Sequence, residues 1–449
     1  MSETPTRIVI LGGGFGGLAV AQELERLLGD APNVEITIVN RDNFFLFTPM
    51  LHEVAASDLD IATIVNPLRK LVRRTAIFIG SVERIDIEAR RVTVSHASGL
   101  HSHELRYDHL VIALGAVTNF YAIPGLAERA ITMKSLNDAM QLRDQLIQCL
   151  EEADFECNAA VRAPLLTFVV AGGGFAGVET VAATNDFLRE ALRFYANLRE
   201  RDVRVVVVHP GSHLLPELGE TLGRYAQERL AERGVEILLN TRVSGTEGDT
   251  VILSDGQRID ARTVVWTAGT SANPLLESLP CGKERGRIRV SEYLQVPEWP
   301  SVWAVGDCAV IPDAATGGYY PPTAQHALRE GRQAARNIVA TMRGAPKTPF
   351  VFSTIGLLAA IGRRTGVANV FGLNFSGFFA WWLWRTIYLA KLPRLEKKVR
   401  AAIDWTLDVV FSKDLVQFGT GRRVFPVPRG HPAHVPAHAA GTISSDASI

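Results

Sequence analysis

A glycine-rich motif near the N-terminus constrains the fold more than any other part of this chain. An apolar run of strand length ends on Gly12, Gly14 and Gly17, in the spacing G-x-G-x-x-G. Residues 18–24 then carry apolar side chains at helical spacing, so the glycines stand where a strand turns into a helix. There Gly12 permits the tight turn, Gly14 lets a pyrophosphate approach the backbone, and Gly17 lets helix and strand pack closely. The motif therefore predicts a dinucleotide-binding unit that holds a diphosphate at the helix N-terminus.

The same motif is repeated further along the chain. A second apolar run leads into Gly172, Gly174 and Gly177 in the same spacing. The parallel continues downstream, where one apolar run ends on Gly115 after the first motif and another ends on Gly269 after the second. Two dinucleotide-binding units in one chain imply two dinucleotides held face to face, as in flavoenzymes. The sequence therefore predicts an α/β fold with two Rossmann-like units.

Composition excludes several classes of function. The chain has 449 residues, enough for two or three domains, and its 47 basic and 47 acidic residues cancel, which argues against a nucleic-acid partner. The first seven residues are polar and run directly into the first strand, so we expect no signal peptide and a cytoplasmic catalytic body. Four cysteines show neither C-x-x-C nor metal-ligand spacing, which predicts reduced structural thiols and no metal site.

Neither unit carries the acidic residue that commonly reads a ribose at the end of the second strand. In the first unit this position, after the strand at 34–39, is Asn40, followed by Arg41; an amide can still hydrogen-bond to ribose hydroxyls. In the second unit, after the strand at 203–208, it is His209. An acid at this position would argue for NADH, and an arginine nearby would argue for NADPH. Because the chain has neither, the nucleotide preference stays open and leans towards NADH.

Other segments complete the expected cofactor sites. Residues 301–307 form a strand that ends on Asp307, whose carboxylate can bind the ribityl hydroxyls of FAD, and 321–331 open a helix whose N-terminal end can lie against the flavin ring. The apolar loop at 43–51 either covers the flavin or fills the core, and its composition favours the core. We predict first-unit contacts at Gly12, Gly14, Phe15, Gly16, Gly17, Asn40, Arg41, Thr48, Val82, Ala113, Gly115, Asp307 and Ala324. We predict second-unit contacts at Gly172, Gly174, Phe175, Ala176, Gly177, His209, Ala268 and Gly269.

Glu179 stands in the first turn of the helix that follows the second motif. A carboxylate at a helix N-terminus is favourable as ordinary helix chemistry. The same position also faces the nicotinamide and the flavin in an enzyme with two dinucleotides. There a carboxyl group can orient the nicotinamide or relay a proton, so we single out Glu179 as a catalytic candidate.

Histidines gather near a predicted β-hairpin formed by residues 82–87 and 91–95. His96, His101 and His103 could suggest a metal site, but no acidic or sulfur ligand cluster accompanies them. We therefore expect a solvated hairpin.

The C-terminal part of the chain differs in character. Residues 377–390 are the densest aromatic cluster, but Arg385 interrupts them and the run is shorter than the ~20 apolar residues that span a bilayer. Basic residues follow from Lys391 to Arg400. This pattern favours a helix lying in a membrane interface, and a buried subdomain or a dimer helix carries nearly equal weight.

Taken together, the motifs resemble the type II NADH:quinone oxidoreductases, which are single-subunit, membrane-associated flavoenzymes that pump no protons. The resemblance covers about residues 6–425. It rests on Gly-Gly-Gly-Phe-Gly-Gly at 12–17, Gly-Gly-Gly-Phe-Ala-Gly-Val-Glu at 172–179, Ala-Val-Gly-Asp at 304–307, Ala324-Gln325, and Tyr-Leu-Ala-Lys-Leu at 388–392.

The resemblance implies FAD on the first unit, NADH on the second, and a quinone that reaches the flavin from the membrane side. We accordingly expect a peripheral protein on the cytoplasmic side of the membrane, and a homodimer. The expected domains are an FAD-binding domain at 1–134 and 286–345, an NAD(P)H-binding domain at 135–285, a membrane-associating or dimer region at 346–425, and a disordered tail at 426–449.

The resemblance also implies three catalytic residues. The family's quinone motif is Ala-Gln-x-Ala-x-Gln; here Gln325 matches its first glutamine, and Arg329 replaces the second. Glu179 carries over as the residue at the nicotinamide–quinone face, and Lys391 as a cation close to the flavin or the quinone. The Arg329 substitution leaves the identity of the quinone, menaquinone or ubiquinone, open.

The expected mechanism is hydride transfer from the nicotinamide to the flavin, followed by delivery of electrons and protons to a quinone. Disulfide reductases share both units but need a C-x₄-C pair, which this chain lacks after the first helix. A sulfide:quinone oxidoreductase would need flavin-facing cysteines, for which Cys157 and Cys308 are the only conceivable partners. A flavoprotein that senses nicotinamide and recruits a partner through its C-terminal region is the alternative from a different class.

Overall fold

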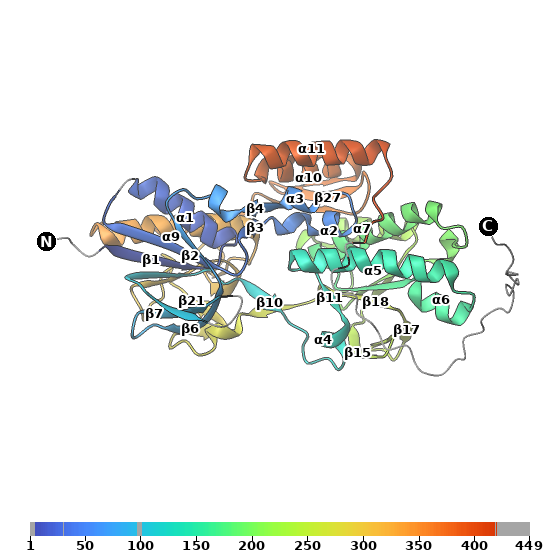
Figure 1. The fold of residues 1–449 in the computed structure, drawn as a ribbon, viewed down its shortest axis with the longest axis horizontal. Coiled ribbons are helices and arrows are strands. Elements are labelled where there is room, and N and C mark those ends of the chain that lie inside the picture. The colour runs from blue at the N-terminus through green and yellow to red at the C-terminus, as the bar shows by residue number, and fades with distance from the viewer. Residues whose placement is uncertain (1–4, 30, 97–100, 418, 420–449) are drawn as a thin grey trace, which may run out of the picture.

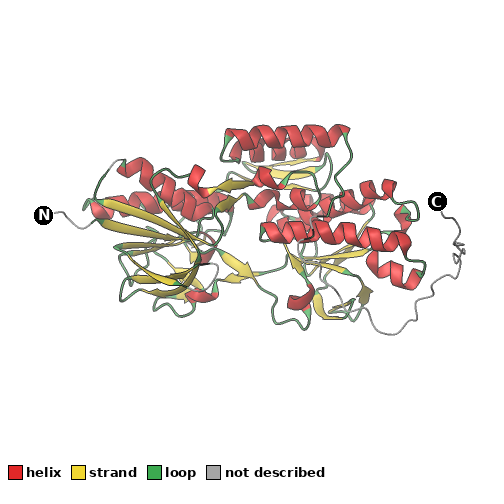
Figure 2. Ribbon diagram, in the orientation of Figure 1, coloured by secondary structure: helices red, strands yellow, loops and turns green. Residues whose placement is uncertain are grey.

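The computed structural model describes residues 5–29, 31–96, 101–417 and 419; the tail predicted at 426–449 lies outside them. The molecule is elongated, with one α/β unit at each end (Figure 1). The C-terminal helices lie across the junction between the units, and each unit combines a sheet with packed helices (Figure 2).

The first unit comprises β1 (Thr6–Leu11), α1 (Phe15–Leu28), β2 (Val34–Asn40), β5 (Ala76–Ile79), β9 (His109–Ile112), β22 (Val302–Ala304) and α9 (Ala324–Met342). Its strands form a parallel sheet in the order β22-β9-β1-β2-β5. Ile8, Ile10 and Leu11 of the central strand β1 are fully buried, as the apolar run predicts for a parallel strand covered on both faces. α1 and α9 pack against each other, and β22 brings the chain back to this sheet after the second unit.

The second unit comprises β11 (Ile131–Thr132), α5 (Leu136–Phe155), α6 (Ala159–Leu165), β12 (Thr167–Ala171), α7 (Phe175–Ala191), β13 (Arg204–His209), α8 (Glu220–Glu232), β14 (Val235–Leu239) and β18 (Thr263–Trp266). Its parallel sheet has the order β11-β18-β12-β13-β14. The central neighbours β18-β12-β13 repeat the arrangement β9-β1-β2 of the first unit. The expected α/β fold with two dinucleotide-binding units is therefore confirmed. α5 begins at a capping box between Ser135 and Asp138.

Smaller antiparallel sheets extend both units. They comprise β6 (Ser81–Asp86), β7 (Arg91–Ser95) and β8 (Ser102–Arg106) in the first unit, β15 (Val243–Glu247), β16 (Thr250–Leu253) and β17 (Arg258–Asp260) in the second, and β10 (Ala116–Thr118) paired with β19 (Thr270–Ala272) between them. The predicted hairpin has a third strand, β8, which includes His103. Nε2 of His96 and Nε2 of His103 lie 3.0 Å apart, and no set of three potential metal ligands gathers in the described part of the chain. Short elements complete the connections: α4 (Leu126–Arg129), β20 (Lys283–Glu284), β21 (Arg287–Arg289), β23 (Ala309–Val310), β24 (Pro312–Asp313) and β25 (Gly318–Tyr319).

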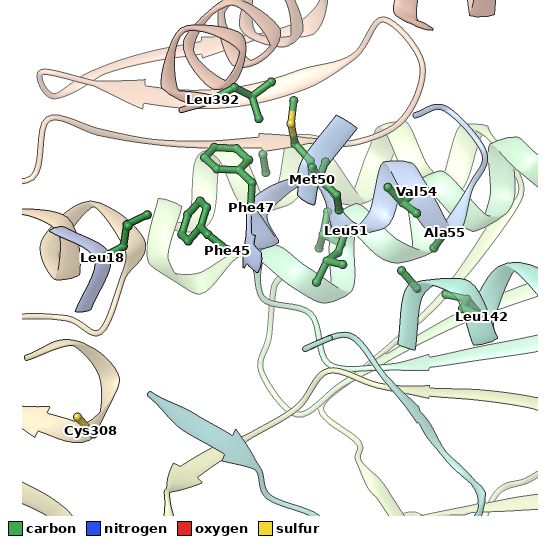
Figure 3. Close-up of a cluster of buried hydrophobic side chains, with 14 of the residues drawn as sticks. Leu18, Phe45, Phe47, Met50, Leu51, Val54, Ala55, Leu142, Cys308 and Leu392 are labelled. Carbon is green, nitrogen blue, oxygen red and sulfur yellow. The ribbon is translucent and has the colours of Figure 1, made fainter. Parts of the chain in front are cut away.

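An apolar segment between β2 and β5 joins the two units. It comprises β3 (Phe44–Leu46), α2 (Leu51–Ala55), α3 (Ile61–Ile64) and β4 (Val65–Pro67). α2 belongs to the first half of the chain but packs against α5 and α7 of the second unit. Val54 and Ala55 of α2 lie close to Leu142 of α5 (Figure 3). This buried contact fixes the segment at the junction of the units.

The C-terminal region comprises β26 (Gly356–Ala360), β27 (Gly366–Val370), β28 (Leu373–Ser376), α10 (Gly377–Lys391) and α11 (Leu395–Val410). The three strands form an antiparallel sheet against which α10 packs. β26 contacts α7 of the second unit, and α11 contacts α3 of the joining segment. The region therefore connects both halves of the molecule. None of the helices in the described residues has the length and apolar character needed to span a bilayer.

Candidate active site

One cavity of about 590 Å³ lies where the two units and the C-terminal region meet. Its lining includes residues from the N-terminal ends of α1, α7 and α9 and from β26 and α10. Because a helix N-terminus presents free N–H groups and the positive end of the helix dipole, three such ends favour anionic groups in this cavity. The predicted site residues in the lining are Gly14, Phe15, Gly16, Thr48, Ala113, Gly115, Phe175, Ala176, Glu179, Asp307, Ala324, Gln325 and Lys391.

The first glycine motif has the close approaches that exclude side chains. Gly12 has a φ of +102°, and a Cβ atom there would lie 2.3 Å from the carbonyl oxygen of Ala113. A Cβ on Gly17 would lie 1.9 Å from the carbonyl oxygen of Gly12, so α1 packs onto β1 only without a side chain. At Gly14 no atom lies within 4 Å of a Cβ position, counting the described residues. The space that a diphosphate needs is therefore open.

The second motif repeats this geometry. Gly172 has a φ of +120°, and a Cβ on Gly177 would lie 1.8 Å from the carbonyl oxygen of Gly172. A Cβ on Gly174 would lie 3.4 Å from Oε1 of Glu217, an acidic residue that the sequence analysis did not select. The second loop therefore offers the same diphosphate cradle as the first, with a carboxylate at its edge.

The two residues predicted at the riboses, Asn40 and His209, both bind their own glycine loops. Oδ1 of Asn40 accepts a hydrogen bond from the N–H of Gly13 at 2.8 Å. In the second unit Nδ1 of His209 accepts one from the N–H of Gly173 at 3.1 Å, and burial lowers the pKa of this imidazole, which keeps it neutral as an acceptor. Each residue thus fixes the loop beside the expected nucleotide. The atoms of each side chain that do not bind the loop determine which hydrogen bonds it can make to a ribose.

Eleven predicted contacts lie outside the lining of the cavity. Seven of them, the remaining motif glycines and the two residues predicted at the riboses, are described above. Of the other four, Arg41 follows β2, Val82 lies in β6, and Ala268 and Gly269 follow β18. The ring of Tyr121 covers Gly269, since a Cβ there would lie 2.4 Å from it. Their contacts with a nucleotide stay predictions.

Asp307 faces the cavity from the turn after β22. Burial raises the pKa of its carboxyl, and Lys134 and Arg287 act in the opposite direction. The turn is fixed by Glu330 of α9, whose Oε2 accepts the N–H of Gly306 at 2.8 Å. Burial raises the pKa of Glu330 to about 8. Sequence reasoning missed Glu330, because an acid inside a polar helix pattern carries no sign that it turns inwards.

Glu179 is buried at the junction of α7, β26 and α10. Its Oε1 accepts hydrogen bonds from the indole N–H of Trp384 at 3.0 Å and from the backbone N–H of Ala360 at 3.2 Å. Burial raises the pKa of Glu179 to about 8, although these two bonds favour the carboxylate. The side chain therefore holds a proton at neutral pH and faces the cavity as an acid.

The residues around Glu179 include two that the sequence analysis did not select. Nδ1 of His52, on α2, lies 3.6 Å from Oε2 of Glu179, and burial lowers the pKa of His52 to about 3. Tyr388 of α10 lines the same cavity. His52 directly follows the apolar loop at 43–51. The one available signal was a charged His-Glu pair ending an apolar run.

A second polar group lies at the start of α9. Nε2 of Gln325 donates to the carbonyl oxygen of Gly356 at 3.3 Å, and Nη1 of Arg329 donates to the carbonyl oxygen of Gln325 at 2.9 Å. The guanidinium of Arg329 lies 4.1 Å from the ring centre of Phe352, a cation–π distance. Burial and Arg329 both lower the pKa of Lys391. Two cations and an amide thus share one end of the cavity.

The cavity fits a flavin nucleotide. An open glycine cradle stands at one end for a diphosphate, a buried carboxyl at Asp307 can bind ribityl hydroxyls, and the volume suits a tricyclic ring beside apolar residues such as Phe47. The lining contains no cysteine among the described residues, and Cys308 is buried against backbone carbonyl oxygens while Cys157 is exposed after α5. This arrangement argues against redox cysteines beside the flavin. The loop at 43–51, expected mainly as core, contributes both buried residues and lining.

Comparisons with known proteins give the family of the chain. Residues 6–331 match the family model described as pyridine nucleotide-disulphide oxidoreductase, and residues 355–414 match the NDH2 C-terminal domain. The chain is 33% identical over 417 residues to a type II NADH:quinone oxidoreductase of Mycobacterium tuberculosis, covering 89% of this chain and 87% of that protein. It is 30% identical to a probable NADH dehydrogenase of Dictyostelium discoideum, covering 92% and 91%.

Solved structures show the same fold. The structure of NDH2 from Plasmodium falciparum in complex with NADH superposes with a TM-score of 0.86 at 19% identity, over 92% of this chain and 99% of that one. The fold, the two glycine cradles around one cavity and the identity to curated relatives converge on a single conclusion. This chain belongs to the type II NADH:quinone oxidoreductase family.

Proposed function

We propose that this protein oxidises NADH through a bound FAD and passes the electrons to a membrane quinone, without pumping protons. NADH:quinone oxidoreduction is the activity of its family. The observation that carries the proposal is the single cavity that both glycine motifs reach, with Gly14 and Phe15 on one side and Phe175 and Ala176 on the other. Two substrates can act on one flavin only if both can reach it.

The first unit would hold FAD. Its glycine loop would bind the diphosphate, Asn40 and Arg41 would lie at the adenosine ribose, Val82 would lie at the adenine, and Asp307 would bind the ribityl hydroxyls. Bound FAD supplies the redox chemistry, because it accepts a hydride from the nicotinamide and returns two electrons to the quinone.

The second unit would hold NADH. Its loop at the start of α7 would bind the diphosphate, and His209 would lie at the ribose beside Gly173. The carboxylate of Glu217 stands at the edge of this cradle. Gly174 would face the diphosphate that NADH and NADPH share, so the proposal of NADH rests on the activity of the family.

The quinone would enter at the end formed by α9 and α10. Gln325, Arg329 and Lys391 line the cavity there and can donate hydrogen bonds to a quinone carbonyl. Glu179 holds a proton at neutral pH, so it can act as a general acid as the quinone is reduced. Neutral and cationic donors on one side and a carboxylic acid on the other suit a carbonyl oxygen that gains negative charge.

The outer face of the C-terminal region supports membrane attachment. α11 exposes apolar residues at intervals of four and turns polar ones inwards: Oδ2 of Asp404 accepts a hydrogen bond from Thr63 at 2.7 Å, and the indole of Trp405 donates to Glu53 at 2.9 Å. A helix with its apolar stripe exposed is the reverse of a surface helix in a soluble protein. The exposed large apolar residues of α10 and α11 are Phe378, Phe379, Trp382, Leu395, Val399, Ile403, Leu407, Val409 and Val410.

We propose that this face lies in the membrane interface, where Arg394, Lys398 and Arg400 can meet anionic headgroups. We also propose that the protein lies on the cytoplasmic side of the membrane and forms a homodimer, and that its domains meet at 134/135, 285/286 and 345/346. The mass of the purified protein in solution tests the homodimer, and limited proteolysis tests the domain limits.

A direct experiment tests the function. The purified protein should be yellow, with one FAD per chain, and should oxidise NADH only when a soluble quinone is present. A colourless protein that stays inactive after FAD is added would contradict the proposal, as would NADH oxidation that is independent of quinone.

A further inference from the structure

A second, smaller cavity lies next to the first. It has a volume of about 40 Å³, and it shares two residues, His52 and Glu179, with the lining of the large cavity. Its other lining residues come from α2, α7, the turn between β26 and β27, α10, α11 and the segment after α11. His52 and Glu179 therefore separate the large cavity from a polar pocket behind it.

The lining of the small cavity carries more acids than bases. The charged and titratable residues are Glu53, Asp58, Glu179, Asp186 and Asp408, against Arg363, Arg385 and Lys413, together with His52. Burial raises the pKa of Glu53 to about 7 and that of Asp58 to about 6, and it also raises the pKa of Asp186. Lys413 forms a buried ion pair with Asp58 and donates to the carbonyl oxygen of Ala56. The cavity wall can therefore store exchangeable protons near neutral pH.

Two buried polar atoms in this wall have no hydrogen-bond partner among the described residues. They are Nε2 of His52 and Nε of Arg385. Buried polar groups without a partner are rare in proteins, and water commonly satisfies them. A cavity of about 40 Å³ exceeds the roughly 10–15 Å³ that a water molecule needs. The small cavity therefore has both the room and the unpaired groups for water.

The proposed reaction needs a proton from outside the substrates. NADH supplies two electrons and one proton as a hydride, whereas a quinone takes two electrons and two protons to become a quinol. One proton per turnover must therefore come from solvent. This requirement rests on the proposed function, and it holds for any quinone.

We propose that the small cavity is the route by which this proton reaches Glu179, with His52 as the relay between cavity water and the Glu179 carboxyl. Glu179 gives its proton to a quinone oxygen, and its carboxylate takes a proton from Nδ1 of His52. Nε2 of His52 takes a proton from a cavity water in the same exchange, and that water regains a proton from solvent. The imidazole stays neutral with its hydrogen on Nε2, and return of the hydrogen to Nδ1 through water resets the relay. No electron moves in these steps, and the net change is one proton passed inwards.

The geometry meets the requirements of such a relay. Nδ1 of His52 lies 3.6 Å from Oε2 of Glu179, longer than a hydrogen bond, so a small side-chain movement or one water molecule completes the link. The low pKa of His52 keeps it neutral, and a neutral imidazole passes protons by exchanging the nitrogen that carries hydrogen. At the other end the side chain of Arg363 is 37% exposed, which opens the wall to solvent.

A matched pair of substitutions at Ala183 tests the route without removing a titratable group. Ala183 lies in the wall of the small cavity on α7, one helical turn after Glu179. Ala183→Val fills the cavity with apolar atoms, whereas Ala183→Thr adds the same volume with a hydroxyl that can pass a proton. We expect Ala183→Val to slow flavin reoxidation by quinone about tenfold and Ala183→Thr to slow it much less. Flavin reduction by NADH should stay unchanged in both, because it takes up no solvent proton.

Glu53→Gln provides a second test, because it keeps an acceptor for the Trp405 indole and removes one exchangeable proton. It should shift the pH profile of flavin reoxidation and raise its solvent isotope effect, which a purely structural change would not do. A crystal structure of the holoenzyme should show ordered water within hydrogen-bond distance of Nε2 of His52. In Ala183→Val this water should be absent.

The outcomes separate the two proposals. If the parent enzyme does not reduce quinone with NADH, the proposed function fails. If it does, and Ala183→Val and Glu53→Gln reoxidise flavin at the parental rate and with the parental pH profile, the proton enters elsewhere and the inference is overturned. A dry small cavity in the crystal structure would also overturn it.

Discussion

The indole N–H of Trp384 donates a hydrogen bond to Oε1 of Glu179 across 3.0 Å, which joins the C-terminal helix α10 to the first turns of the helix after the second glycine motif. Two groups separated by 205 residues of the chain thus meet at the candidate proton donor. The bond favours the carboxylate, and burial favours the acid; burial dominates, since the pKa of Glu179 rises to about 8. The C-terminal region therefore has two roles: its inner side closes the candidate active site, and its outer face is the one that we propose for the membrane interface.

Glu179→Gln should slow quinone reduction. The carboxylic acid can give a proton to the quinone and the amide cannot, so we expect the rate of flavin reoxidation to fall about a hundredfold. Because only the protonated acid is active, the parental rate should decline as pH rises through about 8, and the variant should lack this decline. Stopped-flow reoxidation measured from pH 6 to pH 9 tests both expectations. A parental rate in the variant would exclude Glu179 as the donor.

The same substitution should change the dependence of stability on pH. Glu179 keeps its proton up to about pH 8 in the folded protein, whereas in the unfolded chain it ionises near the ordinary glutamate pKa of 4.5. Its contribution to stability is therefore fully present below about pH 4.5 and is lost as pH rises towards 8. The difference in Tm between Glu179→Gln and the parent should accordingly move in favour of the variant as pH rises from 5 to 9. A difference independent of pH would show that Glu179 ionises normally.

Asp307→Asn should weaken FAD binding about tenfold, because an amide is a poorer acceptor for ribityl hydroxyls than a carboxylate is. Fluorescence of FAD released on dilution measures this loss. Asp313→Asn is the matched control, since Asp313 lies on the same chain segment and its side chain bonds Thr316 in an exposed turn. Equal FAD affinity in the two variants would remove Asp307 from the site.

Glu217→Gln should tighten the binding of NADH. Removing the carboxylate at the edge of the second cradle removes a repulsion against the diphosphate, so the KM for NADH should fall several-fold. The change should shrink at high salt, because screening already weakens the repulsion in the parent. The same KM in parent and variant at low salt would place the diphosphate elsewhere.

Polar substitutions on the outer face of α11 should release the protein from membranes. Leu395→Ser combined with Ile403→Ser removes two exposed apolar residues that make few internal contacts, so Tm should hold while cosedimentation with anionic vesicles falls. The control is Phe155→Ser with Val161→Ser, which removes exposed apolar residues around α6 in the second unit. Equal loss of vesicle binding in both double variants, or none in either, would contradict the assignment of this face. A change in molecular mass on gel filtration would indicate instead that α11 serves a dimer.

The sequence predicted those parts of the fold and site that local pattern determines. Gly12, Gly17 and Gly177 are readable because a Cβ atom at each would lie within 2.3 Å of a backbone carbonyl oxygen, which leaves glycine as the residue that fits. Gly172 combines a φ of +120° with a Cβ position 2.5 Å from Oγ1 of Thr267. The two parallel sheets follow from the apolar runs before each motif. The position of Asp307 in the cavity follows from the short apolar strand before it, although β22 ends at Ala304 and Asp307 lies in the turn that follows, not at the end of a strand over 301–307.

The remaining site residues depend on tertiary contacts. His52 and Glu330 acquire their environments from elements distant in sequence, α7 and the Gly306 turn, so their neighbours in the chain give no warning. The orientation of α11 is similar: the stripe at every fourth residue is visible in the sequence, but a soluble helix would bury it. Contacts of Asp404 and Trp405 with Thr63 and Glu53 reverse that expectation.

Anaerobic stopped-flow spectroscopy of the purified holoenzyme tests the central claim most directly. One equivalent of NADH should bleach the flavin absorbance, and one equivalent of a soluble quinone should then restore it with formation of quinol. Flavin that NADH does not bleach, or that quinone does not restore once it is bleached, would contradict the account.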